Sequence, residues 1–273
     1  PRKVVMLGNF PCILLGCSQK IFFHNLLYLK SLEFPFKYGI KLTLESLFWK
    51  LSIDLIKPDI CVQTNYVKKS LENYFKKELT IKIIGCPIKN KLRVGKKSQK
   101  IKDFCKTFSK IISDNDYLHF IYPAAYYPHK NHKFLFESAD LFKKEKIKIH
   151  LTFSEHHIQK NDFDSGCFVF YNYLNELEIN YLYSKVDALI YTSFTESLGM
   201  PLLEITKHKK PVIAIDLPYV DSAINNFYLF RPSQKSLSKT IKKFKNDLSA
   251  KKVKIARSNI NTNPSIFFEE LLS

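Results

Sequence analysis

Long hydrophobic runs are missing from this sequence. The longest, NFPCILLG at residues 9–16, is interrupted by Pro11 and ends at Gly16, whereas a helix that spans a bilayer needs about 20 apolar residues. We therefore expect no transmembrane helix. The first residues, PRKVVMLG, have neither the charged front nor the small-residue cleavage site of a secretory signal. Because 45% of the residues are hydrophobic and 14% aromatic, a packed interior is expected.

Cysteine motifs that hold metals are also missing. The six cysteines, spread from residue 12 to residue 167, form no CxxC pair and have no companion histidines at zinc spacing. We therefore predict no metal site. Isolated cysteines of this kind are typical of reduced thiols, and we expect a cytoplasmic protein.

Arginine is scarce, although the chain is strongly basic. The net charge is +18, yet only four of the 43 basic residues are arginines. A positive balance suits nucleic acid or an anionic membrane surface. Base recognition and bidentate phosphate contacts favour arginine, however, and lysine is spread here over every segment. The charge therefore permits an anionic ligand or a membrane contact without specifying one, and we expect no nucleic-acid partner.

Short apolar runs alternate with amphipathic segments along the whole chain. Helices are expected where Leu44, Leu47, Phe48, Leu51 and Leu55 share one face, and over residues 67–75, 134–142, 177–186, from 200 onward and 237–248. Strands alternating with helices predict an α/β fold with parallel sheets. The runs expected to form the strands are residues 4–7, 20–23, 59–64, 80–88, 117–122, 147–153, 166–171, 187–192 and 211–216.

The polar segment KNKLRVGKKSQK at residues 89–100 indicates a domain boundary. We predict two Rossmann-like domains that face one another across a cleft, residues 1–92 and residues 93–273. The first domain has fewer βα units than the second, and we expect it to lack its first units. We also expect the last helix to pack back on the first domain.

The stretch TESLGMPLLE at residues 195–204 places Glu196 and Glu204 on either side of Gly199 and Pro201. Ligands of such sheets bind beyond the carboxyl ends of the strands, so this loop should border a pocket. A helix amino end attracts phosphate, and carboxylates accept hydrogen bonds from sugar hydroxyls. The stretch therefore favours a nucleotide sugar as ligand. The helix dipole alone also favours acidic residues near a helix start, and this alternative stays open.

The segment ESLGMPLLE, followed by PVIAIDLPYVDSAI, resembles the Glu, seven residues, Glu element of the retaining GT-B glycosyltransferases of family 4. Residues 122–142, YPAAYYPHKNHKFLFESADLF, are similar to the segment that holds the family's diphosphate-binding lysine. FFHNLLYL at residues 22–29 and DICVQTNYVKKSL at 59–71 are similar to parts of the family's amino-terminal domain. The resemblance covers nearly the whole chain in the family's order. Among the members of this family, the sequence most resembles the bacterial ones that assemble surface polysaccharides such as O-antigen and lipopolysaccharide.

The resemblance implies a role for each matching residue. Glu204 would hold the ribose hydroxyls, and Glu196 would orient the transferred sugar. Lys130 would neutralise the leaving diphosphate, and His24 would touch the donor sugar. The remaining donor contacts would come from Ser197, Leu198, Gly199 and Met200 through backbone N–H groups, from Tyr173 at the base, and from His129 or Asn131 in place of an arginine that the family commonly carries where this chain has Ala124 and Ala125. Each of three residues could instead have a purely structural role: Lys130 as a solvated lysine, His24 as a structural histidine and Tyr173 as a core aromatic.

The activity that the resemblance implies is transfer of a hexose from a nucleotide-diphosphate sugar to a hydroxyl of a lipid-linked saccharide, with the anomeric configuration retained and no metal or other cofactor. Exposed lysines could hold such an enzyme at the anionic inner face of the cell membrane. Two other interpretations stay open. The chain could be a nucleotide-sugar epimerase of the same fold, or a truncated, non-catalytic protein that binds nucleotide sugars.

Overall fold

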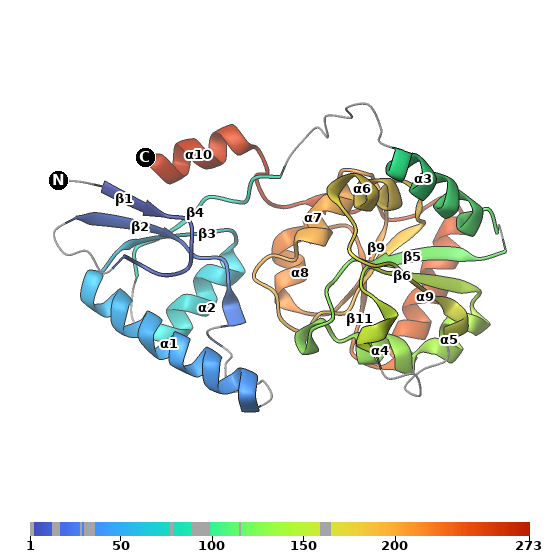
Figure 1. Cartoon of the computed structure of the whole chain (residues 1–273), viewed down its shortest axis with the longest axis horizontal. Helices are drawn as coiled ribbons and strands as arrows, with labels where there is room; N and C mark the ends of the chain where they lie inside the picture. Colours follow the sequence, from blue (N-terminus) through green and yellow to red (C-terminus); the bar gives the residue numbers. More distant parts are fainter. Residues whose placement is uncertain are drawn as a thin grey trace.

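The structure is a computed structural model, and it describes residues 3–12, 17–27, 29, 36–76, 79–88, 99–114, 116–158 and 165–273. It contains two domains, one built on a four-stranded sheet and one on a six-stranded sheet (Figure 1). Every strand pair in these two sheets is parallel. The predicted α/β fold with two Rossmann-like domains is confirmed. The predicted boundary between residues 92 and 93 lies outside the described residues.

The amino-terminal sheet has the strand order β1-β2-β3-β4. Helix α2 begins after Thr64, whose side chain accepts a hydrogen bond from the N–H of Val67 and so caps the helix. The elements of this domain are β1 (Lys3–Met6), β2 (Ser18–Phe22), α1 (Phe36–Ile56), β3 (Asp59–Val62), α2 (Asn65–Phe75) and β4 (Ile81–Ile83).

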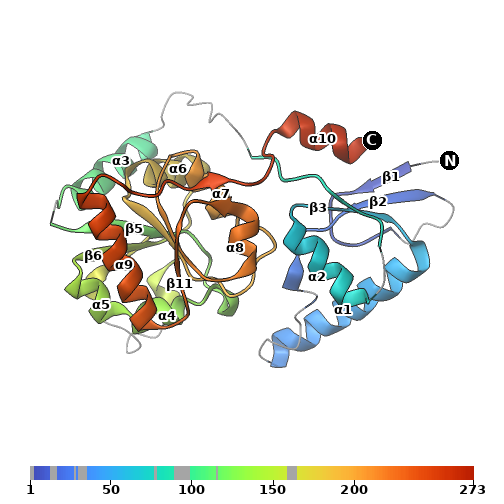
Figure 2. The same cartoon turned by 180° about the vertical axis from the view of Figure 1, so that it is seen from behind.

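The two faces of this sheet are covered by different parts of the chain. Successive residues of a strand point to opposite faces. Ile21 and Ile60 pack with α1 and α2 on one side, whereas Phe22 and Cys61 pack on the other side against α10 (Pro264–Leu272). Figures 1 and 2 both show α10 over the amino-terminal sheet, opposite α1 and α2. The last helix of the chain is therefore part of the amino-terminal domain's core.

Helix α1 corrects one expectation about burial. The helix lies where it was predicted, but the apolar face seen in the sequence is on the outside. The side chains turned inward are Leu42, Trp49 and Ile53 together with two serines. The exposed ones are Ile40, Leu44, Leu47, Phe48, Leu51 and Leu55. Because apolar residues occur all around α1, periodicity alone could not decide which side packs on the sheet.

The carboxyl-terminal sheet has the order β11-β9-β8-β5-β6-β7. Its strands are β5 (Leu118–Tyr122), β6 (Ile147–Leu151), β7 (Phe168–Phe170), β8 (Ala188–Tyr191), β9 (Val212–Ile215) and β11 (Tyr228–Phe230), and β10 (Ile224–Asn225) pairs antiparallel with β12 (Arg257–Ser258). Its helices are α3 (Gln99–Ile112), α4 (His132–Glu137), α5 (Ala139–Lys144), α6 (Glu176–Lys185), α7 (Met200–Thr206), α8 (Pro218–Ala223) and α9 (Gln234–Ser249). The helix predicted over 134–142 is thus two short helices, α4 and α5.

Two connections between the domains run side by side. The N–H groups of Cys86 and Ile88 donate to the carbonyls of Asn261 and Thr262 at 3.2 Å each. Gly85 has φ +72°, and a Cβ there would lie 2.4 Å from the carbonyl oxygen of Asn261. Only glycine therefore permits this close approach without strain.

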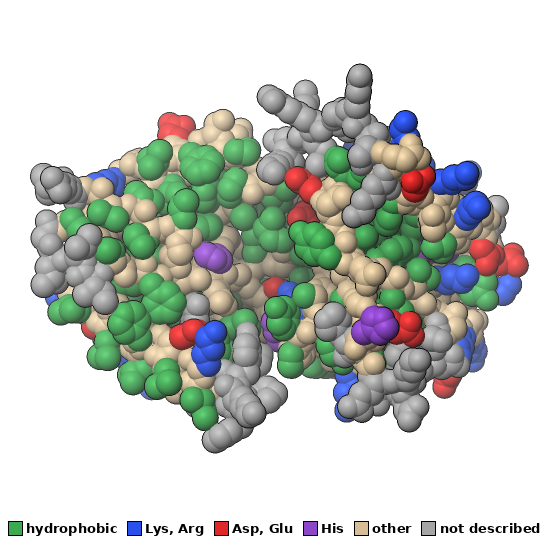
Figure 3. Space-filling model, viewed as in Figure 1, with side chains coloured by type: hydrophobic (Ala, Val, Ile, Leu, Met, Phe, Trp, Pro, Cys, Tyr) green, Lys and Arg blue, Asp and Glu red, His purple; other side chains and the backbone are tan. Residues whose placement is uncertain are grey.

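None of the helices within the described residues is long and apolar enough to cross a membrane. On the face of the molecule in Figure 3, charged side chains gather on the carboxyl-terminal domain, and hydrophobic ones cover much of the amino-terminal domain. The same view shows a hollow between the two domains.

Candidate functional site

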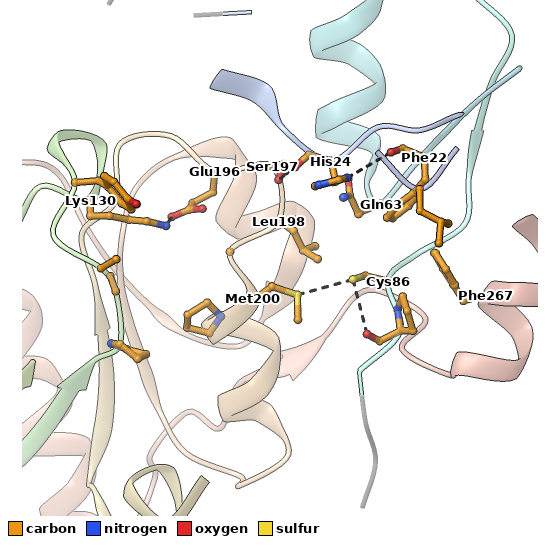
Figure 4. Close-up of a pocket in the computed structure, with 18 of the residues that line it drawn as sticks. Phe22, His24, Gln63, Cys86, Lys130, Glu196, Ser197, Leu198, Met200 and Phe267 are labelled. Carbon is orange, nitrogen blue, oxygen red and sulfur yellow. Dashed lines mark hydrogen bonds and ion pairs between the residues drawn. The ribbon is translucent and has the colours of Figure 1, made fainter. Parts of the chain in front are cut away.

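The carboxyl ends of strands from both sheets face one cavity of about 630 Å³ between the domains (Figure 4). The loops after β5 and β8 border it from one side, and the residues after β2 and β3 border it from the other. This position agrees with the rule for ligand sites in open parallel sheets. The lining residues are Leu7, Phe22, His24, Gln63, Cys86, Pro87, Pro123, Ala124, Ala125, Tyr127, Lys130, Glu196, Ser197, Leu198, Gly199, Met200, Pro201, Phe267 and Phe268.

Lys130 and Glu196 form an ion pair at this cavity, with 2.5 Å between Lys130 Nζ and Glu196 Oε1. The hydroxyl of Tyr191 donates to the same Oε1 at 2.9 Å. The two charged side chains are largely buried, 18% and 12% exposed. They are the only Lys, Arg, Asp or Glu side chains among the described residues that line the cavity. A shielded pair of this kind interacts more strongly than one on the surface.

Three buried tyrosines support the two loops that carry this pair. Tyr122 donates its hydroxyl to the carbonyl of Lys130 at 2.6 Å, and Tyr219 donates to the carbonyl of Ser193 at 2.7 Å. Tyr191 holds the carboxylate of Glu196, as described above. Burial raises the pKa of all three phenols well above the ordinary value, so they remain donors at neutral pH. The two loops are therefore held in place by hydrogen bonds that are shielded from solvent.

His129 and Asn131 lie beside Lys130 but do not line the cavity. The carbonyl of His129 accepts the N–H of Phe194 at 2.8 Å, and the side chain of Asn131 donates to the carbonyl of Thr192 at 3.3 Å. Both residues therefore join the loop after β5 to the loop after β8. Burial, followed by the charge of Lys130, lowers the pKa of His129. In this structure the two residues place Lys130 rather than reach the cavity.

The segment from Ser197 to Met200 lines the cavity, as does His24 on the opposite wall. Gly199 has φ +70° and precedes the first residue of α7, and a Cβ there would approach Leu202 to 3.0 Å. Ser197 donates its hydroxyl to the carbonyl of His24 at 2.6 Å, and the thiol of Cys86 lies 3.8 Å from the sulfur of Met200. These contacts join the two domains directly at the cavity.

Glu204 and Tyr173 are not among the residues that line the cavity. Glu204 accepts a hydrogen bond from the hydroxyl of Tyr183 on α6 at 2.8 Å, and burial raises its pKa. Tyr173 is 91% exposed and not in the core, so the structure rules out the core alternative for it. The structure thus gathers His24, Lys130, Glu196 and the segment 197–200, and leaves Glu204, His129, Asn131 and Tyr173 outside the cavity.

Several lining residues were not anticipated from the sequence. Gln63 follows β3, and Phe267 and Phe268 come from α10, more than 200 residues further along the chain. The position after a strand end could have pointed to Gln63. Nothing local distinguishes the two phenylalanines, because only the return of α10 to the first domain brings them there. No group of three or more His, Cys, Asp or Glu side chains suited to a metal ion occurs within the described part of the chain.

The comparisons with known proteins decide the family. The model of the family "Glycosyl transferases group 1" matches residues 103–261, more than half of the chain. The chain belongs to the glycosyl transferases group 1 family. No curated protein matches it in sequence. The matched residues contain Lys130, Glu196 and the segment 197–200.

Solved structures of glycosyltransferases share the fold of this group 1 member. They include WaaG, a glycosyltransferase involved in lipopolysaccharide biosynthesis (TM-score 0.63, 14% identity), sucrose-phosphate synthase from Thermosynechococcus elongatus (0.62, 13%) and Anabaena HepE with UDP and glucose (0.62, 15%). The alignments cover 89%, 88% and 85% of this chain, and 68%, 61% and 63% of those chains, respectively. The likeness shows the GT-B arrangement of two Rossmann-like domains. The chain spans only about two thirds of the length of these proteins.

Proposed function

We propose that the chain is a retaining, metal-independent glycosyltransferase of family 4 that moves a hexose from a nucleotide-diphosphate sugar to a hydroxyl group. The observation that carries this proposal is the Lys130–Glu196 pair at the cavity between the domains, inside the segment matched by the family. One cation and one carboxylate, both shielded and both at the ends of parallel strands, suit a ligand that has a diphosphate next to a sugar.

Lys130 would oppose the negative charge of the departing diphosphate. Two unit charges about 4 Å apart interact by about 4 kcal/mol at an effective dielectric of 20, so this cation would be a major contribution. In the structure its partner is Glu196. Donor binding would move Lys130 from Glu196 to the diphosphate, and the carboxylate, still held by Tyr191, would then accept hydrogen bonds from the sugar hydroxyls.

The other donor contacts would surround this pair. Backbone N–H groups of residues 197–200 would face the sugar and the diphosphate, and His24 would approach the sugar from the other domain. Glu204 would hold the ribose, with Tyr183 fixing its orientation. Tyr173, His129 and Asn131 would reach the donor only if their loops move toward the cavity. Closure of the two domains would exclude water from the reaction.

The acceptor that we propose is a lipid-linked saccharide in surface polysaccharide synthesis, at the cytoplasmic face of an anionic membrane. The exposed apolar face of α1 supports a membrane contact, since Leu44, Leu47 and Leu51 are solvent-exposed on one side of the helix. Lys41 and Lys50 are exposed on the same helix and suit anionic headgroups. Flotation of the protein with vesicles, with and without anionic lipid, tests this contact.

The enzyme activity is tested with a panel of nucleotide sugars. At least one should raise the melting temperature, and Lys130→Ala and Glu204→Ala should reduce that shift. Lys133→Ala is the matched control, because Lys133 is an exposed lysine three residues away that does not line the cavity. Transfer to an acceptor hydroxyl with a retained anomeric configuration supports the proposal. Conversion of the donor to an epimer, or binding without turnover, would contradict it in favour of an epimerase or a non-catalytic binding protein.

A further inference from the structure

The two walls of the cavity differ in chemistry. Lys130 and Glu196 lie on the wall formed by the carboxyl-terminal domain. The opposite wall contains four hydrophobic side chains, which we call the aromatic wall: Leu7, Phe22, Phe267 and Phe268. Figure 4 shows Phe22 and Phe267 on the far side of the cavity from the Lys130–Glu196 pair. No Lys or Arg occurs among the described lining residues of that side.

The aromatic wall has a buried base and an exposed surface. Phe22 and Phe267 are buried and meet edge to face, with 5.0 Å between ring centroids and an interplanar angle of 81°. Phe268 stands at 80° to Phe267 with 5.3 Å between centroids, and is 48% exposed. Leu7 is 58% exposed. Such an arrangement holds the Phe268 ring in place while leaving it open to a ligand.

A polar group without a partner lies at the same cavity. Gln63, at the end of β3, is 3% exposed, and its Oε1 has no hydrogen-bond partner within the described part of the structure. A buried amide oxygen left unpaired costs about 1–3 kcal/mol. Gln63 lines the cavity, so a ligand hydroxyl that donated to Oε1 after rotation of the side-chain amide would remove this cost.

We propose that the aromatic wall and Gln63 form the acceptor subsite, and that the subsite takes a neutral sugar ring rather than a phosphorylated sugar. This inference rests on the proposed glycosyltransferase function. The ring would place its C–H face on Phe268 and Leu7 and donate one hydroxyl to Gln63. The subsite opens into the same cavity as the Lys130–Glu196 pair, so its occupant is the molecule that meets the donor.

A phosphate on the acceptor would lose its hydration against this wall. Charged groups taken from water need a cation or several hydrogen-bond donors, and phosphate sites usually contain Arg or Lys. The one described lysine of the cavity is already required by the donor diphosphate. Among its described residues this wall offers a phosphate no Lys or Arg, and His24 on the same side is assigned to the donor sugar, so the wall should select against sugar phosphates.

Saturation-transfer NMR on the whole chain tests this subsite. The probes are the methyl glycosides of glucose, galactose, mannose and N-acetylglucosamine, each paired with the 6-phosphate of the same sugar. At least one neutral glycoside should bind, more tightly than its phosphorylated counterpart. Phe268→Ala should weaken that binding about 5- to 10-fold, as expected for loss of an aromatic contact, and Phe268→Tyr should preserve it. Gln63→Leu should weaken it about 5-fold.

Ile266→Ala is the matched control, because Ile266 is exposed on the same helix and does not line the cavity. Calorimetric titration with nucleotide sugars on the same variants separates this inference from the proposed function. If the unmodified protein bound no nucleotide sugar, the proposed function would be contradicted. Normal nucleotide-sugar binding would contradict the subsite alone if the 6-phosphates bound more tightly than the glycosides, if no neutral glycoside bound, or if Phe268→Ala had no effect.

Discussion

The two domains use their apolar side chains differently. In the carboxyl-terminal domain, β8 and β9 are fully buried, and their side chains join one large core. In the amino-terminal domain, the longest helix, α1, buries Trp49 and Ile53 but leaves a row of leucines in solvent. The charged side chains that line the cavity follow the same division, since Lys130 and Glu196 both belong to the carboxyl-terminal domain. We therefore propose that the carboxyl-terminal domain binds the donor and that the apolar surfaces of the amino-terminal domain meet less polar partners.

Among the substitutions proposed here, loss of Lys130 should change activity most. If the carboxyl-terminal domain provides the charge that stabilises the leaving diphosphate, Lys130→Ala should lower the initial transfer rate by about 100- to 1,000-fold, as loss of one preorganised electrostatic contact commonly does. The rate is measured with the nucleotide sugar that stabilises the protein best. Lys133→Ala should keep the full rate. Equal losses in both variants would mean that general charge, not this position, matters.

Matched leucine substitutions compare the two domains in stability. Leu189 in β8 is fully buried, so Leu189→Ala should lower the free energy of unfolding by about 2–5 kcal/mol. Leu51 on α1 is 60% exposed, and Leu51→Ala should change that free energy by no more than about 0.5 kcal/mol. Urea unfolding measures both. A large loss for Leu51→Ala would show that the outer face of α1 is packed in solution.

Acid should act mainly through the carboxyl-terminal domain. Burial, followed by the charge of Lys130, lowers the pKa of His132 to about 3, and the ring packs against Tyr122 and Phe153. The unfolded chain accepts the proton near pH 6.5 and the folded chain does not. The stability that neutral His132 contributes is therefore fully present above pH 6.5. It is lost as the pH falls from about 6.5 toward 3, by up to about 1.4 kcal/mol per pH unit.

His132→Phe should remove the contribution of His132, so that the free energy of unfolding falls less steeply between pH 6.5 and pH 5, while His150, whose pKa burial also lowers to about 3, keeps part of the slope. Urea unfolding at several pH values measures the slope. His156→Phe is the control, since His156 is exposed. An unchanged slope in His132→Phe would mean that His132 is not buried in its neutral form.

Substitutions on the exposed surface of α1 should have a smaller effect. Replacing Leu47 and Leu51 together by Gln should weaken binding to anionic vesicles about 10-fold, because two leucines would no longer enter the interface. The measurement is co-sedimentation with vesicles over a range of lipid concentrations. Leu248→Gln, at an exposed position of α9 in the other domain, should bind like the unmodified protein. Equal binding by all variants would exclude α1 as the contact.

The strands could be predicted because each is a short apolar run next to a polar turn. All nine predicted strands are present, although several are shorter than expected, as with β4 at Ile81–Ile83. Helix α3 was missed because its segment follows the polar stretch taken as a boundary, even though Ile101 and Phe108 pack inward. Strand β11 was missed because a run of three residues gives little periodic signal.

Residues of the candidate site could be predicted only where they directly follow the end of a strand. Lys130, Glu196 and His24 lie in loops after β5, β8 and β2, and the structure brings them to one cavity. Tyr191 and Tyr122 were not predicted, since a buried tyrosine that holds a loop has the same sequence signal as any core aromatic. Phe267 and Phe268 depend on the path of α10 between domains. Such contacts arise from tertiary packing and leave no local pattern.

A nucleotide-diphosphate sugar should bind at the Lys130–Glu196 pair. A crystal structure of the protein with the nucleotide sugar that stabilises it best tests this claim most directly. We expect a diphosphate oxygen within hydrogen-bond distance of Lys130 Nζ, with Glu196 turned to the sugar hydroxyls and the donor sugar facing the aromatic wall. A nucleotide sugar bound elsewhere, with the Lys130–Glu196 pair still closed, would contradict it.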